Sequence, residues 1–83
     1  MAKIEVTIHN KIGIRTLAQI FTERTLISTG IVDPGESCTL TAESGLYDIY
    51  FKNGMTGWEL ARKLGGGAKR VTLSEHKGRY VVS

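Results

Sequence analysis

The chain has 83 residues, of which 41% are hydrophobic and 23% are charged, a composition that indicates one globular domain and excludes a disordered chain. Its single cysteine excludes an internal disulfide framework, and with it a small secreted scaffold stabilised by such bridges. The first residues lack the features of a signal peptide, and no stretch reaches the roughly 18 apolar residues of a membrane span. We therefore expect a cytoplasmic protein, with a phage or virion component as the alternative.

The net charge of +3 is unevenly distributed along the chain. Residues 1–50 carry four basic and six acidic side chains, whereas residues 51–83 carry seven basic and two acidic ones. This asymmetry fits an anionic partner. It fits equally a subunit whose basic part meets the acidic part of a neighbouring copy.

Residues 3–9 alternate between polar and apolar side chains, with Ile4, Val6 and Ile8 on one face, which predicts a half-buried strand. Residues 14–24 fit two structures. Their apolar side chains recur at helical spacing, whereas their Ile, Thr and Phe residues favour a strand. We favour the strand, with a short helix as the alternative.

The middle of the chain shows regular turn signals. Pro34 and Gly35 predict a turn, and a second turn is predicted at 44–45. Residues 37–42 and 46–51 alternate in the manner of strands. The second of these strands places three side chains on one face: Tyr47, Ile49 and Phe51. Turns about ten residues apart are typical of a meander or a sandwich.

Residues 57–64 carry helix signals, because Thr56 and Glu59 have the spacing of a capping box and Gly65 follows as a stop. Gly57 and the shortness of the segment count against a helix. Helix and strand therefore both stay open here.

As a strand, the same segment would turn Trp58 and Leu60 inward. Residues 70–73 and 79–82 predict two final strands, the last of them at the edge of a sheet. We predict a mainly β single domain over residues 1–83, a small antiparallel sandwich or a partly open barrel. Short helices are expected only in the two ambiguous segments, 14–24 and 57–64.

The stretch ARKLGGGAKR at 61–70 combines three glycines with basic pairs on both sides. It lacks the Walker spacing, since Arg70 follows Lys69 where Ser or Thr is required, and a strand follows it in place of a helix. The glycine amides could form an anion nest beside Lys63. The favoured interpretation is a mobile, solvated connection.

Basic residues in the last third of the chain alternate with aromatic ones, which suits single-stranded nucleic acid, although the rings could equally be core. The candidate residues for binding an anion or a partner are Trp58, Arg62, Lys63, Lys69, Arg70, Lys77 and Arg79.

His9, Cys38 and His76 are the soft-metal ligand types, and their spacing does not indicate a metal site. Cys38 is interpreted as a small buried hydrophobic residue. Asp48 would be a perturbed carboxylate if it faced inward. No constellation of catalytic residues is recognisable, so we expect no catalytic site, no cofactor, no metal and no enzyme activity.

Two resemblances follow from turn motifs. Asn10, DPGES at 33–37 and GLYDI at 45–49 resemble small bacterial β-sandwich modules, which are mostly non-catalytic, and this implies the fold class. NGMTGW at 53–58 with GGGA at 65–68 resembles two loops of the chagasin-type cysteine-peptidase inhibitors. The family's proline is replaced by glycine in the first of these loops, and its third loop is absent.

The expected function is a non-catalytic binding or self-assembling interaction module that forms homo-oligomers through exposed strand edges and charge complementarity. The first alternative is a protein that binds nucleic acid or another polyanion through the basic last third of the chain. The second is a loop-based peptidase inhibitor. The expected partner is another copy or another protein, with nucleic acid as the alternative and no membrane span.

Overall fold

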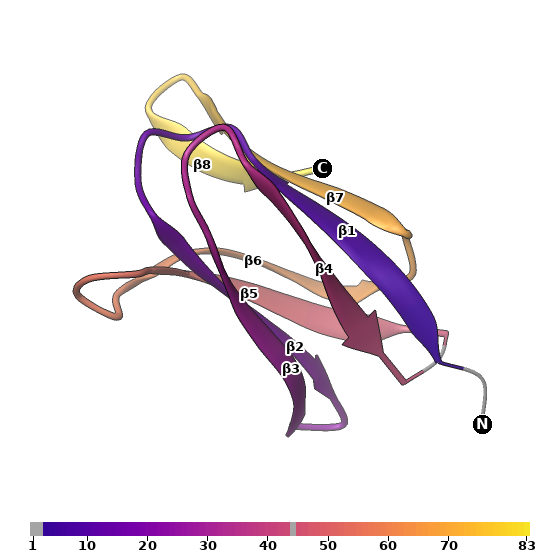
Figure 1. Cartoon of the computed structure of the whole chain (residues 1–83). Helices are drawn as coiled ribbons and strands as arrows, with labels where there is room; N and C mark the ends of the chain where they lie inside the picture. Colours follow the sequence, from indigo (N-terminus) through magenta and orange to yellow (C-terminus); the bar gives the residue numbers. More distant parts are fainter. Residues whose placement is uncertain (1–2, 44) are drawn as a thin grey trace.

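The computed structural model describes residues 3–43 and 45–83, which form a sandwich of two four-stranded sheets (Figure 1). The strands are β1 (Ile4–Asn10), β2 (Thr16–Thr22), β3 (Thr25–Val32), β4 (Ser37–Ala42), β5 (Tyr47–Asn53), β6 (Glu59–Gly66), β7 (Arg70–His76) and β8 (Arg79–Val82). The first sheet has the order β4-β1-β7-β8 and the second β3-β2-β5-β6. The predicted β-sandwich is thus confirmed, with one parallel pair, β1 with β7, among antiparallel ones.

The strand favoured for residues 14–24 is confirmed, and the helices left open there and at 57–64 are absent, because the described part of the chain contains no helix. The first segment forms β2, which pairs with β3 and β5, and the second contributes to β6, which pairs with β5. Pairing with neighbouring strands satisfies backbone groups that a short helix would leave open at its ends. Among the described residues, no helix could span a membrane.

Alternation along the strands fills the space between the two sheets. The faces predicted to point inward in β1 and β5 do so, with Val6 and Ile8 of β1 and the three side chains of β5 buried. The buried hydrophobic residues are Val6, Ile8, Ile12, Ala18, Ile20, Val32, Leu40, Ala42, Tyr47, Ile49, Phe51, Val71 and Leu73. Cys38, predicted to be buried, is partly buried and packs against this core. The turn predicted at 44–45 includes Ser44, which lies outside the described residues.

Asn10, at the end of β1, is a fully buried polar side chain. Its amide nitrogen donates to the carbonyl oxygens of Ile14 and Val32, both at 2.9 Å, and its amide oxygen accepts from the N–H of Ile12 at 2.9 Å. The same nitrogen lies 3.3 Å from the hydroxyl of Thr16, which is also buried. Asn10 ends β1 of the first sheet, whereas Ile14 precedes β2 and Val32 ends β3 of the second sheet. This one side chain therefore joins both sheets.

We predict that Asn10→Ala lowers the free energy of unfolding by about 3 kcal/mol, because several buried polar groups lose their partners at once. That is a large share of the roughly 4–12 kcal/mol typical for a domain of this length. Urea unfolding measures the loss. Ser37→Ala, which removes an exposed hydrogen bond to His9, is the matched control and should cost less than about 1 kcal/mol. Equal losses in the two variants would contradict the role of Asn10.

The hairpin between β2 and β3 turns through Glu23 and Arg24, which have positive φ values of 50° and 69°. Two-residue hairpins of this kind favour Asn followed by Gly, because bulkier side chains are strained at positive φ. In the hairpin between β7 and β8, Gly78 already occupies the second position, after Lys77.

We therefore expect Glu23→Asn combined with Arg24→Gly to stabilise the protein by about 1 kcal/mol, which would raise Tm by about 5 °C. A thermal melt followed by circular dichroism measures the shift. Lys77→Asn should produce a smaller change, because only one strained position is relieved there. An unchanged or lowered Tm of the double variant would show that the turn is not strained.

Candidate interaction surface

The sandwich has four edge strands. On one side, a hydrogen bond from a side chain joins the edges of the two sheets. β3 and β4 are the edges on that side, and they belong to different sheets. The hydroxyl of Ser28 in β3 donates to the carbonyl oxygen of Thr41 in β4 at 2.7 Å. The backbone of β4 is therefore partly satisfied by the opposite sheet.

β6, an edge of the second sheet, pairs irregularly with β5. The register shifts between Tyr47 and Ile49 and again between Phe51 and Lys52. Lys63 of β6 lies opposite Ile49, a core residue. Irregular pairing at an edge opposes the addition of another strand.

β8, an edge of the first sheet as predicted, pairs regularly with β7. Thr72 and Ser83 exchange two backbone hydrogen bonds of 2.9 Å just beyond the end of β8. Because hydrogen-bonded and non-hydrogen-bonded pairs alternate in antiparallel strands, Tyr80 and Val82 turn their N–H and C=O groups away from β7. In the described part of the chain, no backbone hydrogen bond joins β8 to β6, which lies beside it.

The side chains of β8 divide between the two faces of the sheet. Tyr80 and Val82 are partly buried and pack against the core. Val81 lies opposite Ser74 on the outer face, with 38% of its surface exposed. The strand therefore has a fixed inner face, a free backbone edge and one exposed apolar side chain.

The predicted basic residues lie on both sheets and on the connections between strands. Arg62 lies on β6 of the second sheet, where its guanidinium is 5.2 Å from the centre of the Tyr50 ring and 2.8 Å from the carboxylate of Glu59. The hydrogen bond to Glu59 raises the pKa of Arg62. Arg70 opens β7 in the first sheet, and Arg79 lies opposite the last residue of β7, about 20 Å of strand away. The remaining three occupy β6, the β6–β7 connection and the β7–β8 turn: Lys63, Lys69 and Lys77.

Trp58 does not turn inward, and this prediction is wrong, whereas Leu60 packs against the core as expected. Trp58 lies just before β6 with 76% of its surface exposed, and Met55 is 89% exposed. The Asn53 side chain holds the loop by accepting from the N–H groups of Met55 and Thr56. Both exposed side chains are thus presented by an ordered loop.

Gly54 is required in this loop by its close approach to the β1–β2 connection. Its N–H donates to the carbonyl oxygen of Arg15 at 2.8 Å, and a Cβ at this position would lie 2.9 Å from the same oxygen. The glycine that replaces the proline of the inhibitor family is therefore built into the fold. Loops 53–58 and 65–68 lie at opposite ends of β6, roughly 20 Å of strand apart.

The glycine-rich stretch 61–70 is mostly strand, which corrects the prediction of a mobile connection. Its first six residues belong to β6, and only residues 67–69 cross between the sheets. The N–H of Thr7 donates to the carbonyl oxygen of Lys69 at 2.8 Å, and the buried hydroxyl of Tyr47 donates to that of Ala68. These bonds tether the crossing at both sheets.

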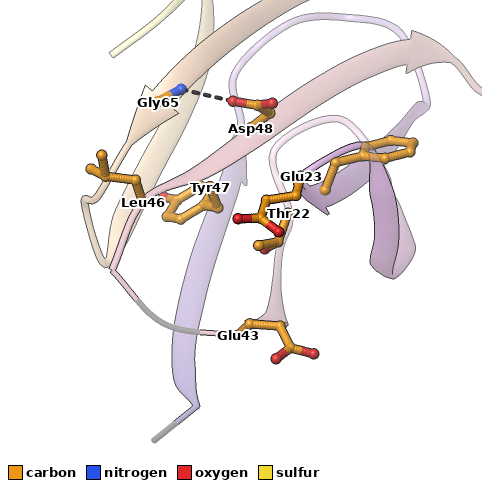
Figure 2. Close-up of a pocket in the computed structure, with 8 residues that line it drawn as sticks. Thr22, Glu23, Glu43, Leu46, Tyr47, Asp48 and Gly65 are labelled. Carbon is orange, nitrogen blue, oxygen red and sulfur yellow. Dashed lines mark hydrogen bonds between the residues drawn. The ribbon is translucent and has the colours of Figure 1, made fainter. Parts of the chain in front are cut away.

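Asp48 lies on the outer face of β5 and occupies the predicted anion nest. Its carboxylate accepts from the N–H of Gly65 at 2.8 Å, as Figure 2 shows. Gly65 has a positive φ of 67°, which suits glycine. The carboxylates of Glu23 and Glu43 line the same hollow. An external anion would therefore compete with an internal carboxylate and meet two further negative charges.

Burial raises the pKa of Tyr47, so the neutral phenol is favoured in the folded protein. Its contribution to stability is complete below the ordinary tyrosine pKa of about 10 and is lost as the pH rises through the raised value. We expect Tyr47→Phe to cost about 1 kcal/mol at neutral pH, through the lost bond to Ala68, and to flatten this alkaline decline.

Urea unfolding between neutral and alkaline pH measures both effects. A Cys38→Ala background is used for both proteins, because burial also raises the pKa of that thiol. The same alkaline decline with and without the phenol would contradict this assignment.

Among the four edge strands, β4 and β8 both pair regularly, but Ser28 of the opposite sheet bonds to the outward carbonyl of Thr41 in β4, whereas the described residues show no such bond to β8. Comparisons of the chain with models of protein families, with curated proteins and with solved structures found no match. The function is therefore inferred from the geometry of this edge.

Proposed function

We propose that this protein is a non-catalytic interaction module that forms homo-oligomers through its exposed strand edge. The free backbone groups of Tyr80 and Val82 carry this proposal. Such an edge is a ready template for pairing with another strand, and hydrogen bonds between main chains supply the attraction. The pairing of β8 with β7 has no bulge, so the free backbone groups recur at regular spacing along this edge.

Pairing of β8 with β8 of a second copy, antiparallel about a two-fold axis, has one register that uses all the free groups. In it, Tyr80 forms a hydrogen-bonded pair with Val82 of the second copy, and Val82 with Tyr80 of the second copy. Val81 then lies on the axis, opposite Val81 of the second copy, at the Cα separation of about 4.5 Å typical of non-hydrogen-bonded pairs. The exposed side chain of Val81 would be covered by its equivalent.

Charge does not oppose this register strongly. Arg79 lies opposite Ser83 of the second copy, so the two Arg79 residues are about 13 Å apart along the strands. That distance exceeds the Debye length of about 8 Å at physiological salt. A head-to-tail contact between acidic and basic parts of the chain would instead weaken as salt is added.

We expect light scattering to show a mass that rises from that of a monomer towards that of a dimer as the protein concentration increases. The dimer should persist at high salt. Val81→Lys should abolish the dimer, because it places two like charges on the axis. Thr39→Lys, on the outer face of the other edge of the same sheet, is the matched control and should leave the dimer intact. A monomer at every concentration would contradict self-association.

Cysteine cross-linking tests the register itself. In a Cys38→Ala background, Val81→Cys should form a disulfide between two copies on mild oxidation, since the expected Cα separation suits such a bond. Thr39→Cys should not. A dimer that tolerates Val81→Lys and gives no cross-link at position 81 would place the contact on another surface.

A further inference from the structure

The outer face of the first sheet, away from the free edge, is hydroxyl-rich. β1 lies between β4 and β7 (Figure 1). The register places Thr7 opposite Thr39 of β4 and Arg70 of β7, and it places His9 opposite Ser37 and Thr72. Side chains directly opposite each other on one face of a sheet are neighbours. Residues from three strands therefore meet on this face.

These side chains surround a hollow of about 390 Å³. Its lining includes two basic side chains, an imidazole and three hydroxyl groups: Lys11, Arg70, His9, Thr7, Ser37 and Thr72. No carboxylate lines it among the described residues, in contrast to the hollow of Figure 2. The two hollows therefore differ in charge.

Two hydrogen bonds hold parts of the lining in place. Nδ1 of His9 and the hydroxyl oxygen of Ser37 are joined by a hydrogen bond of 2.6 Å, which orients the imidazole ring. The N–H of Lys11 donates to the carbonyl oxygen of Leu73 at 2.8 Å, so the backbone beside the lysine is fixed to β7.

We propose that this hollow binds a tetrahedral oxyanion, of the kind carried by a phosphate or sulfate ester. The guanidinium of Arg70 would contact two of its oxygens, Lys11 would supply a second positive charge, and the hydroxyls of Thr7 and Thr72 would donate to the rest. Glu5, the nearest acidic residue on this face of β1, lies opposite Thr41, beyond Thr7 and away from Lys11. The net charge at the hollow is therefore positive.

This site is independent of the proposed self-association, because none of its lining residues belongs to β8. It also differs from the basic set expected from the sequence. It takes only Arg70 from that set and adds Lys11 and His9 from the acidic half of the chain. General attraction of anions to a basic surface would not single out these residues.

Titration with inorganic phosphate, followed by the backbone amide resonances of the full chain, tests the proposal. We expect saturable shifts concentrated at Thr7, His9, Lys11 and Thr72, with a Kd of about 1 mM, as befits a small exposed site. Arg70→Gln should weaken binding about tenfold, and Arg70→Lys should restore only part of it, because an ammonium lacks the bidentate fork. Inorganic sulfate, titrated in parallel, shows whether the site distinguishes the two anions.

Lys77→Gln is the matched control, because it removes the same charge from the β7–β8 turn and should leave the Kd within about twofold. Equal weakening by Arg70→Gln and Lys77→Gln would reduce the effect to general electrostatics and overturn the site. Shifts that never saturate, or that centre on other residues, would overturn it as well. Retained shift dispersion in each variant shows that the fold is intact.

Discussion

The buried amide of Asn10 is the constraint on which the arrangement of this sandwich depends. A polar side chain with no access to water must satisfy its groups internally, and Asn10 does so with the β1–β2 connection and with the end of β3. Its own backbone bonds to Glu36 and Gly35 in the turn before β4. The connections at this end of the molecule, and hence the stacking of the two sheets, are organised around one side chain.

At the opposite end of the sandwich, hydrogen bonds to the β6–β7 connection hold the two sheets together. The chain crosses from β6 to β7 through three residues, and hydrogen bonds from Tyr47 and Thr7 fasten that crossing to both sheets. With both ends fixed, the edges differ in how they meet solvent. One side is bridged by Ser28 and Thr41, and β6 pairs irregularly with β5, whereas β8 pairs regularly with β7 and turns unpaired backbone groups outward. The proposed self-association through β8 rests on this difference.

Charges that are clustered in the sequence are dispersed in the fold. Arg62 and Arg70 are eight positions apart, yet they lie on different sheets, because the chain crosses the sandwich between them. Arg62 is engaged with Tyr50 and Glu59, whereas Arg70 joins Lys11, which is nearly sixty residues earlier. Residues 1–50 and residues 51–83 do differ in net charge, but the order of the strands determines which of these charges lie side by side.

Local patterns in the sequence determined the strands, their inward faces and the turn at Pro34. Alternation and turn chemistry act between residues only a few positions apart, so they can be recognised without a partner. The β-sandwich itself and the edge position of the last strand followed from the same reasoning.

Only the tertiary structure decided that residues 57–64 contribute a strand, that Trp58 is exposed, and that Asn10 joins the two sheets. It also decided which edge stays open and which basic residues meet. Each of these depends on strands brought together from distant parts of the chain, whose pairing satisfies the backbone and determines which side chains are covered. A sequence pattern specifies the faces of a strand, and the neighbours of that strand specify what each face touches.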